Sequence, residues 1–262
     1  SESGPVSTAV KREGAIRARL SYNATYGCRG FDRVTEPETG VSGSDGCGWD
    51  RTGRLVWRDR ILDSASWRFV EPGESIAGSL TGEELTPQAA LERVALQAGP
   101  SGLRHLVVGV IGPRAATPRQ ERLAEALGAA LAALQVTVIC GGRGGVMAAV
   151  SAGVAAAGGL CLGLLPGTDP GEANPHVAIP LPTGLGEGRN MVIARAARVL
   201  VAVGSSHGTI TEMAYGLHFG KTVLVLDEAP DIPGLSRVRT VEQALDGCCR
   251  ALLRQADGNR VS

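Results

Sequence analysis

Arg189 and Glu212 are the two residues whose types and surroundings suit chemistry best. Each lies near the expected start of a helix, and the glycine-rich run 204–209 lies between them. A glutamate carboxyl near a ribose can stabilise an oxocarbenium-like centre or activate a water molecule. The forked guanidinium of Arg189 suits a phosphate or the Glu212 carboxylate. The alternatives are that Glu212 only compensates the dipole of its helix and that Arg189 is a plain surface residue.

Three glycine-containing segments, 111–114, 141–145 and 204–209, each follow an expected strand. The backbone N–H groups of such turns converge on an anion, and the dipole of the following helix supports it. The candidate phosphate- or nucleotide-binding residues are Gly112, Gly141, Gly142, Arg143, Gly144, Gly145, Asn190, Gly204, Ser205, Ser206, His207, Gly208 and Thr209. The loop at 141–145 is not a dinucleotide fingerprint, since Met147 stands where a third glycine would be needed, and the sequence contains no Gly-x-x-x-x-Gly-Lys-Ser/Thr Walker motif. The other interpretation is that these glycines serve tight packing.

Apolar, β-branched runs alternate with amphipathic runs from residue 105 onward. The strands expected from this pattern are 105–111, 136–140, 160–165, 176–181, 199–203 and 222–226, and the helices 117–134, 145–157, 188–197, 209–219 and 240–255. Continuous apolar strands that alternate with helices indicate a parallel sheet covered on both faces. The fold class is therefore α/β, a doubly wound, Rossmann-like parallel sheet whose ligands bind at the carboxyl ends of the strands.

The first hundred residues differ in composition. They hold seven of the nine aromatic residues, short alternating runs at 54–57 and 66–70, and a Gly-, Ser- and Asp-rich stretch at 40–48 that we expect to be a loop. Thr86 and Pro87 open a helix that runs to about Gln97. We predict a β-rich accessory region with a linking helix over 1–100 and a nucleotide-binding domain over 101–262. The accessory region either packs on the domain or supplies aromatic rings to a base-binding pocket.

Composition limits the partners. The chain has 262 residues, 44% of them hydrophobic and 20% charged, and no formal net charge. A neutral chain whose only lysines are Lys11 and Lys221 argues against nucleic acid, single-stranded DNA included, and against a charged membrane surface. We expect no membrane partner, since no run of 18 apolar residues and no signal pattern is present. The six cysteines lack metal-ligand spacing, so we expect a cytoplasmic protein with free thiols, no metal and no cofactor.

Two motifs resemble the LOG (Lonely Guy) family, long mislabelled as lysine decarboxylases, which includes phosphoribohydrolases of cytokinin nucleotides. Its signature is an Arg-Lys pair followed by Pro-Gly-Gly-x-Gly-Thr-x-x-Glu, and the interval from Arg189 to Glu212 matches it without a gap. Asn190 replaces the lysine, and residues 204–206 replace Pro-Gly-Gly. Residues 141–147 resemble the family's first glycine loop. The resemblance covers about 105–227 and is closest to the branch that includes a molybdenum-cofactor carrier.

The resemblance implies that Arg189 and Glu212 are a catalytic pair and that Gly208 and Thr209 hold a phosphate. We therefore expect hydrolysis of the N-glycosidic bond of a nucleoside 5′-monophosphate, which gives a base and ribose 5-phosphate. The alternative is a carrier that holds a nucleotide or a molybdopterin-type cofactor without turnover. The resemblance also implies a homodimer or a higher homo-oligomer.

Overall fold

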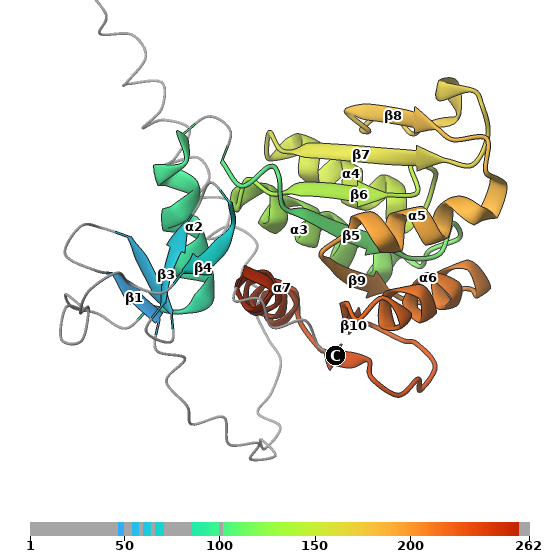
Figure 1. Ribbon diagram of the computed structural model, residues 1–262. Helices are drawn as coiled ribbons and strands as arrows, with labels where there is room; N and C mark the ends of the chain where they lie inside the picture. Colours follow the sequence, from blue (N-terminus) through green and yellow to red (C-terminus); the bar gives the residue numbers. More distant parts are fainter. Residues whose placement is uncertain are drawn as a thin grey trace, which may run out of the picture. The chain divides into compact units, whose positions relative to one another are not determined.

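A seven-stranded parallel sheet with helices on both faces forms the main part of the protein (Figure 1). The computed structural model describes residues 47–49, 54–57, 60–63, 66–70, 85–99 and 102–256. The strands of the large sheet are β5 (Val107–Ile111), β6 (Thr137–Cys140), β7 (Leu160–Leu165), β8 (Ile179–Pro182), β9 (Val199–Val203), β10 (Thr222–Leu226) and β11 (Ser236–Val238). Their order across the sheet is β11-β10-β9-β5-β6-β7-β8, so the predicted fold class is confirmed.

The helices that follow these strands lie close to their predicted positions. They are α3 (Pro118–Ala133), α4 (Val146–Ala156), α5 (Arg189–Ala196), α6 (His207–His218) and α7 (Val241–Ala256), with the short 3₁₀ helices η2 (Pro170–Glu172) and η3 (Gly186–Gly188). Thr117 caps α3 in a full capping box with Gln120. Two edge strands differ from the prediction. The first, β8, begins at Ile179 and contains two prolines, which only an edge strand tolerates. The second, β11, is short and largely exposed and shows no apolar run that would predict it.

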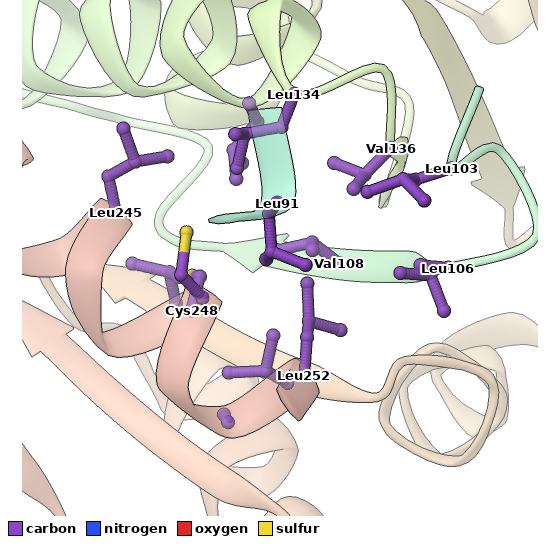
Figure 2. Close-up of a cluster of buried hydrophobic side chains, with 14 of the residues drawn as sticks. Leu91, Leu103, Leu106, Val108, Leu134, Val136, Leu245, Cys248 and Leu252 are labelled. Atoms are coloured by element: carbon purple, nitrogen blue, oxygen red, sulfur yellow. The ribbon is translucent and has the colours of Figure 1, made fainter. Parts of the chain in front are cut away.

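Successive side chains of each strand point to opposite faces of the sheet. Because the central strands carry apolar residues at successive positions, both faces of the sheet are apolar. In β9, Val199, Val201 and Val203 belong to the core cluster under α3, α4 and α7. Leu200 and Ala202 belong to the cluster under α5 and α6. Figure 2 shows the first cluster, where Leu91 of helix α2 (Pro87–Gln97) and Leu252 of α7 lie near Val108 of β5. This double burial explains the continuous apolar runs in the sequence.

The alanine-rich helices α3 and α4 pack against each other along glycine. A Cβ at Gly128 would collide with the carbonyl oxygen of Val150, and a Cβ at Gly153 would collide with the carbonyl oxygen of Glu125. The two backbones therefore approach more closely than any larger side chain allows. This contact lies within the chain, so the homo-oligomer that the resemblance implies stays a prediction.

A small antiparallel sheet precedes the large one. Its strands, in the order β1-β2-β3-β4, are β1 (Cys47–Trp49), β2 (Leu55–Trp57), β3 (Arg60–Asp63) and β4 (Arg68–Val70). Helix α2 (Pro87–Gln97) follows, capped by Thr86 as predicted. The expected loop at 40–48 is wrong for residues 47 and 48, which pair with β2, and its other residues lie outside the described part.

Aromatic side chains of the small sheet are core residues. The rings of Trp49, Trp57, Trp67 and Phe69 are buried, and Trp67 Nε1 donates a hydrogen bond of 3.2 Å to the carbonyl oxygen of Leu252 in α7. A buried ring offers no face to a ligand base, so these four support packing rather than a lid. The aromatic residues at 22, 26 and 31 lie outside the described part. The domain boundary at residue 100 stays a prediction.

Candidate functional site

The three glycine-containing segments meet at the carboxyl edge of the large sheet, the edge where its parallel strands end. The strand order reverses between β5 and β9, and ligands of such sheets bind at that reversal. The segment after β5 contacts the one after β6, because the N–H of Val146 donates to the carbonyl oxygen of Pro113 at 3.1 Å. Gly112 packs between Val146 and the carbonyl oxygen of Val203, where no Cβ would fit.

The first glycine loop, residues 141–145, connects β6 to α4. Gly142 and Gly145 have φ values of 72° and 64°, which favour glycine. Asn174 holds the loop from the segment after β7, because its Nδ2 donates to the carbonyl oxygens of Gly142 at 3.1 Å and Arg143 at 3.0 Å. The N-cap of α4 is Gly145, and no side chain caps this helix. At the start of α4 the N–H of Val146 is taken by Pro113, and no side chain accepts from the N–H groups that follow it.

The second glycine loop, residues 204–206, connects β9 to α6, and here a side chain does cap the helix. Its φ of 70° at Gly204 again favours glycine. The hydroxyl of Ser206 accepts the N–H of Thr209 at 3.2 Å and lies 2.9 Å from the Thr209 hydroxyl. Ser206 is thus the N-cap of α6, and the helix begins at His207, two residues earlier than predicted. Ser205 and Gly208 are half-buried beside this cap, and His207 is exposed.

Arg189 begins α5, as predicted, and is buried with only 7% of its surface exposed. Its guanidinium lies against Gly141, where a Cβ would collide with Nη1. Its Nε is buried and has no hydrogen-bond partner in the described part of the chain. Burial lowers the pKa of Arg189, and the neighbouring Glu212 opposes this. Such an orphan donor on a buried cation is costly unless a ligand accepts from it.

Glu212 lies in the second turn of α6 and is 6% exposed. The predicted helix start at residue 209 would place Glu212 in the first turn, which is wrong because the helix begins at His207, directly after its cap Ser206. The dipole effect fades beyond the first turn, so dipole compensation explains Glu212 poorly. Burial raises its pKa to about 8, although Arg189 acts to lower it. No ion pair joins Glu212 to Arg189 among the described residues.

Asn190 and Cys140 surround this pair. Asn190 is buried, and its Nδ2 donates to Thr211 Oγ1 at 3.5 Å, which ties α5 to the start of α6. The thiol of Cys140 lies 3.9 Å from that of Cys161. The hydrogen bond to Cys161 is the main factor that lowers the pKa of Cys140, and Arg189 contributes. Both thiols are free and buried, as expected from their apolar strands.

A pocket of about 290 Å³ opens beside the first glycine loop. The residues that line it are Arg114, Arg143, Gly144, Glu172, Ala173 and Asn174. Arg143 forms an ion pair with Glu172 across it. Among the candidate residues named from the sequence, only Arg143 and Gly144 line this pocket. Glu172 and Asn174 belong to the segment after β7, and the sequence does not predict either of them as a site residue.

The site contains no evident metal centre. Within the described residues, no group of three or more His, Cys, Asp or Glu side chains is arranged to hold a metal ion. None of the described helices is long and apolar enough to cross a membrane.

Comparison with known protein families identifies the family of this chain. The SLOG cluster4 family matches residues 105–246, which include the whole site. The chain belongs to this family. An uncharacterised protein from Archaeoglobus fulgidus is 33% identical over 146 residues, which cover 56% of this chain and 96% of that relative. The LOG resemblance therefore holds at the level of this wider family.

Two solved structures resemble this SLOG cluster4 chain. The molybdenum cofactor carrier protein of Chlamydomonas reinhardtii is 33% identical, with a TM-score of 0.53, over 56% of this chain and 98% of that one. The molybdenum cofactor binding protein of Rippkaea orientalis is 30% identical, with a TM-score of 0.52, over 54% of this chain and 93% of that one. Both likenesses are confined to about half of this chain.

Proposed function

We propose that the protein hydrolyses the N-glycosidic bond of a nucleoside 5′-monophosphate and releases the base and ribose 5-phosphate. One observation carries this proposal: a buried Arg189 with an unpartnered Nε lies near a buried Glu212 whose pKa is raised to about 8. A carboxyl that stays protonated at neutral pH can donate its proton, and groups with such displaced pKa values gather at catalytic sites.

The reaction needs one proton that cycles through Glu212. The protonated carboxyl donates to a nitrogen of the departing base while the bond between that nitrogen and C1′ breaks. The resulting carboxylate stabilises the oxocarbenium-like sugar and then takes a proton from the water that attacks C1′. Glu212 returns to its acid form. Base and ribose 5-phosphate account for all atoms of nucleotide and water.

Arg189 and the first glycine loop hold the nucleotide in this scheme. The unpartnered Nε–H of Arg189 donates to a ribose or phosphate oxygen, which removes the cost of the buried orphan. The loop at 141–145 holds the 5′-phosphate by backbone N–H groups. The loop at 204–206 fixes the start of α6, the helix that carries Glu212. Asn190 ties α5 to α6 and so keeps Arg189 near Glu212.

The test is a panel of nucleoside 5′-monophosphates incubated with purified protein, with free base measured by chromatography. At least one nucleotide should release its base, and Glu212→Gln should slow this release at least about 100-fold, because it removes the acid and keeps the shape. Glu125→Gln, an exposed carboxyl on α3, is the matched control and should retain the rate. A Glu212→Gln variant as fast as the wild type would rule out this mechanism.

The second candidate is a carrier that holds a nucleotide or a molybdopterin-type cofactor without turnover. The similarity to the two molybdenum-cofactor proteins supports it. Native mass spectrometry of freshly purified protein separates the two functions. A carrier retains an intact ligand and releases no base from any nucleotide, whereas a hydrolase releases base and shows turnover.

A further inference from the structure

The pocket beside the first glycine loop is distinct from the Arg189–Glu212 pair, since neither residue lines it. Two arginines, Arg114 and Arg143, are among its lining residues. Arg114, from the segment after β5, is exposed and forms no ion pair with another described residue. The side chain of Arg143 is 27% exposed and is paired with Glu172. Two arginines around one small pocket fit an oxyanion with several acceptor oxygens.

The backbone that carries Arg143 is fixed in place. Asn174 Nδ2 donates to the carbonyl oxygen of Arg143, and the N–H of Asn174 donates to the carbonyl oxygen of Gly142 at 2.8 Å. Gly144 faces open space, because a Cβ there would meet only Arg114 at 3.9 Å. Helix α4 begins directly after this loop without a side-chain cap. The pocket thus combines two cations with an uncapped helix start on a rigid loop.

Glu172 is the only acidic residue among the pocket's lining residues. Its carboxylate pairs with Arg143 and lies against Gly167, where a Cβ would collide with Oε1. A carboxylate and a phosphate present the same kind of acceptor oxygens to a guanidinium. The pair is partly exposed, with 35% of the Glu172 side chain accessible, and such pairs exchange partners at little cost.

We propose that this pocket binds a phosphate or carboxylate group of the ligand, and that Glu172 occupies the place of this anion when the ligand is absent. This inference rests on the proposed function in one respect only: both place an anionic ligand at the carboxyl edge of the sheet. It assigns Arg114 and Arg143 as anion-binding residues and Glu172 as their internal competitor. Binding of the anion frees Glu172 from Arg143.

The first test is calorimetric titration of the full chain with inorganic phosphate, which needs no turnover. Arg143→Gln should weaken phosphate binding about tenfold, because it removes a charge-assisted hydrogen bond. Glu172→Gln should strengthen phosphate binding about two- to fivefold, because the competitor is gone. A gain of affinity cannot arise from misfolding, so the two variants check each other.

Two variants outside the pocket control for general charge effects. Arg122→Gln on α3 and Glu242→Gln on α7 remove exposed charges of the same signs and should leave phosphate affinity unchanged. If Glu172→Gln changes affinity no more than Glu242→Gln, Glu172 is not a competitor and the proposal is overturned. Equal losses in Arg143→Gln and Arg122→Gln would overturn it as well.

A second experiment decides whether the anion belongs to the ligand or is a free ion. Phosphate should inhibit base release competitively with the nucleotide, and Arg143→Gln should weaken this inhibition. Noncompetitive inhibition would mean a separate anion site and would overturn the assignment to the ligand. If no nucleotide is hydrolysed, the proposed function fails, yet the titration still tests the pocket. If hydrolysis occurs while Arg143→Gln binds phosphate normally, the pocket assignment alone fails.

Discussion

The two glycine loops at the carboxyl edge follow buried strands in the same way and end differently. The loop at 141–145 leads into α4 without a side-chain cap, and two arginines lie beside it. The loop at 204–206 leads into α6, whose start is capped by Ser206. In the first loop no side chain of the protein accepts from the N–H groups that follow Val146 at the helix start. In the second, the hydroxyl that would bind an anion binds the protein instead.

This difference separates two tasks that the sequence pattern assigned jointly to both loops. An uncapped loop with nearby cations suits anion binding, whereas a self-capped loop fixes the helix that carries Glu212. Glycine density alone does not distinguish the two. The hydrogen-bond partner of the cap residue does, and this gives the comparison measurable consequences.

The largest effect on activity is expected for Arg189. This residue lies against the first loop, and it lies near Glu212, which belongs to α6, the helix after the second loop. Arg189→Met should slow base release about 100-fold or more, because the buried donor to the ligand is lost. Phosphate titration of the same variant should still show binding at the pocket, which Arg189 does not line. Loss of phosphate binding together with activity would mean that the two loops form one undivided site.

Stability should depend on pH through Glu212. Between its ordinary pKa of 4.5 and the raised value of about 8, the folded state binds one more proton there than the unfolded state. The free energy of unfolding therefore decreases as pH rises through this window. Glu212→Gln should remove on the order of 3 kcal/mol of this decrease between pH 5 and 8. Urea unfolding at several pH values measures it, and identical pH profiles for variant and wild type would contradict the raised pKa.

A substitution in the first loop tests its backbone. Gly145 combines a φ of 64° with a ψ of −132°, and a Cβ there would collide with the carbonyl oxygens of Pro113 and Arg114. Gly145→Ala should cost about 2 to 3 kcal/mol of stability and weaken phosphate binding. Gly144→Ala is the control, because its Cβ would enter open space. Thermal unfolding compares the two, and equal losses would contradict the geometry of this loop.

The smallest effect is expected in the second loop. Ser206→Ala should cost about 1 kcal/mol, the usual value of a helix N-cap, and should leave phosphate affinity within about twofold of the wild type. Thr117→Ala, which removes the cap of α3, should cost a similar amount. If Ser206→Ala weakens phosphate binding as much as Arg143→Gln does, the distinction between the loops fails.

The sequence predicts most of the fold because the strands of a doubly wound sheet are apolar on both faces. The strands 160–165, 199–203 and 222–226 lie where their apolar runs predict them. The edge strand β11 escapes prediction because it is short and exposed. The sequence predicts the start of α6 two residues late, because its pattern does not distinguish a serine that caps a helix from one that contacts a ligand.

The site was only partly predictable for a different reason. Arg189, Glu212 and the glycine loops are visible as a spaced motif within one stretch of chain. Glu172 and Asn174 reach the first loop from the segment after β7, and only the fold brings them there. The raised pKa of Glu212 arises from burial, which no local pattern of residues specifies.

The protonated state of Glu212 is the central claim, and a carboxyl titration tests it most directly. Nuclear magnetic resonance of protein labelled with carbon-13 in the glutamate carboxyls, assigned by comparison with Glu212→Gln, follows this group through the pH range. The account predicts a carboxyl that titrates at a pKa of about 8. A Glu212 signal that titrates near 4.5, the ordinary glutamate value, would contradict it.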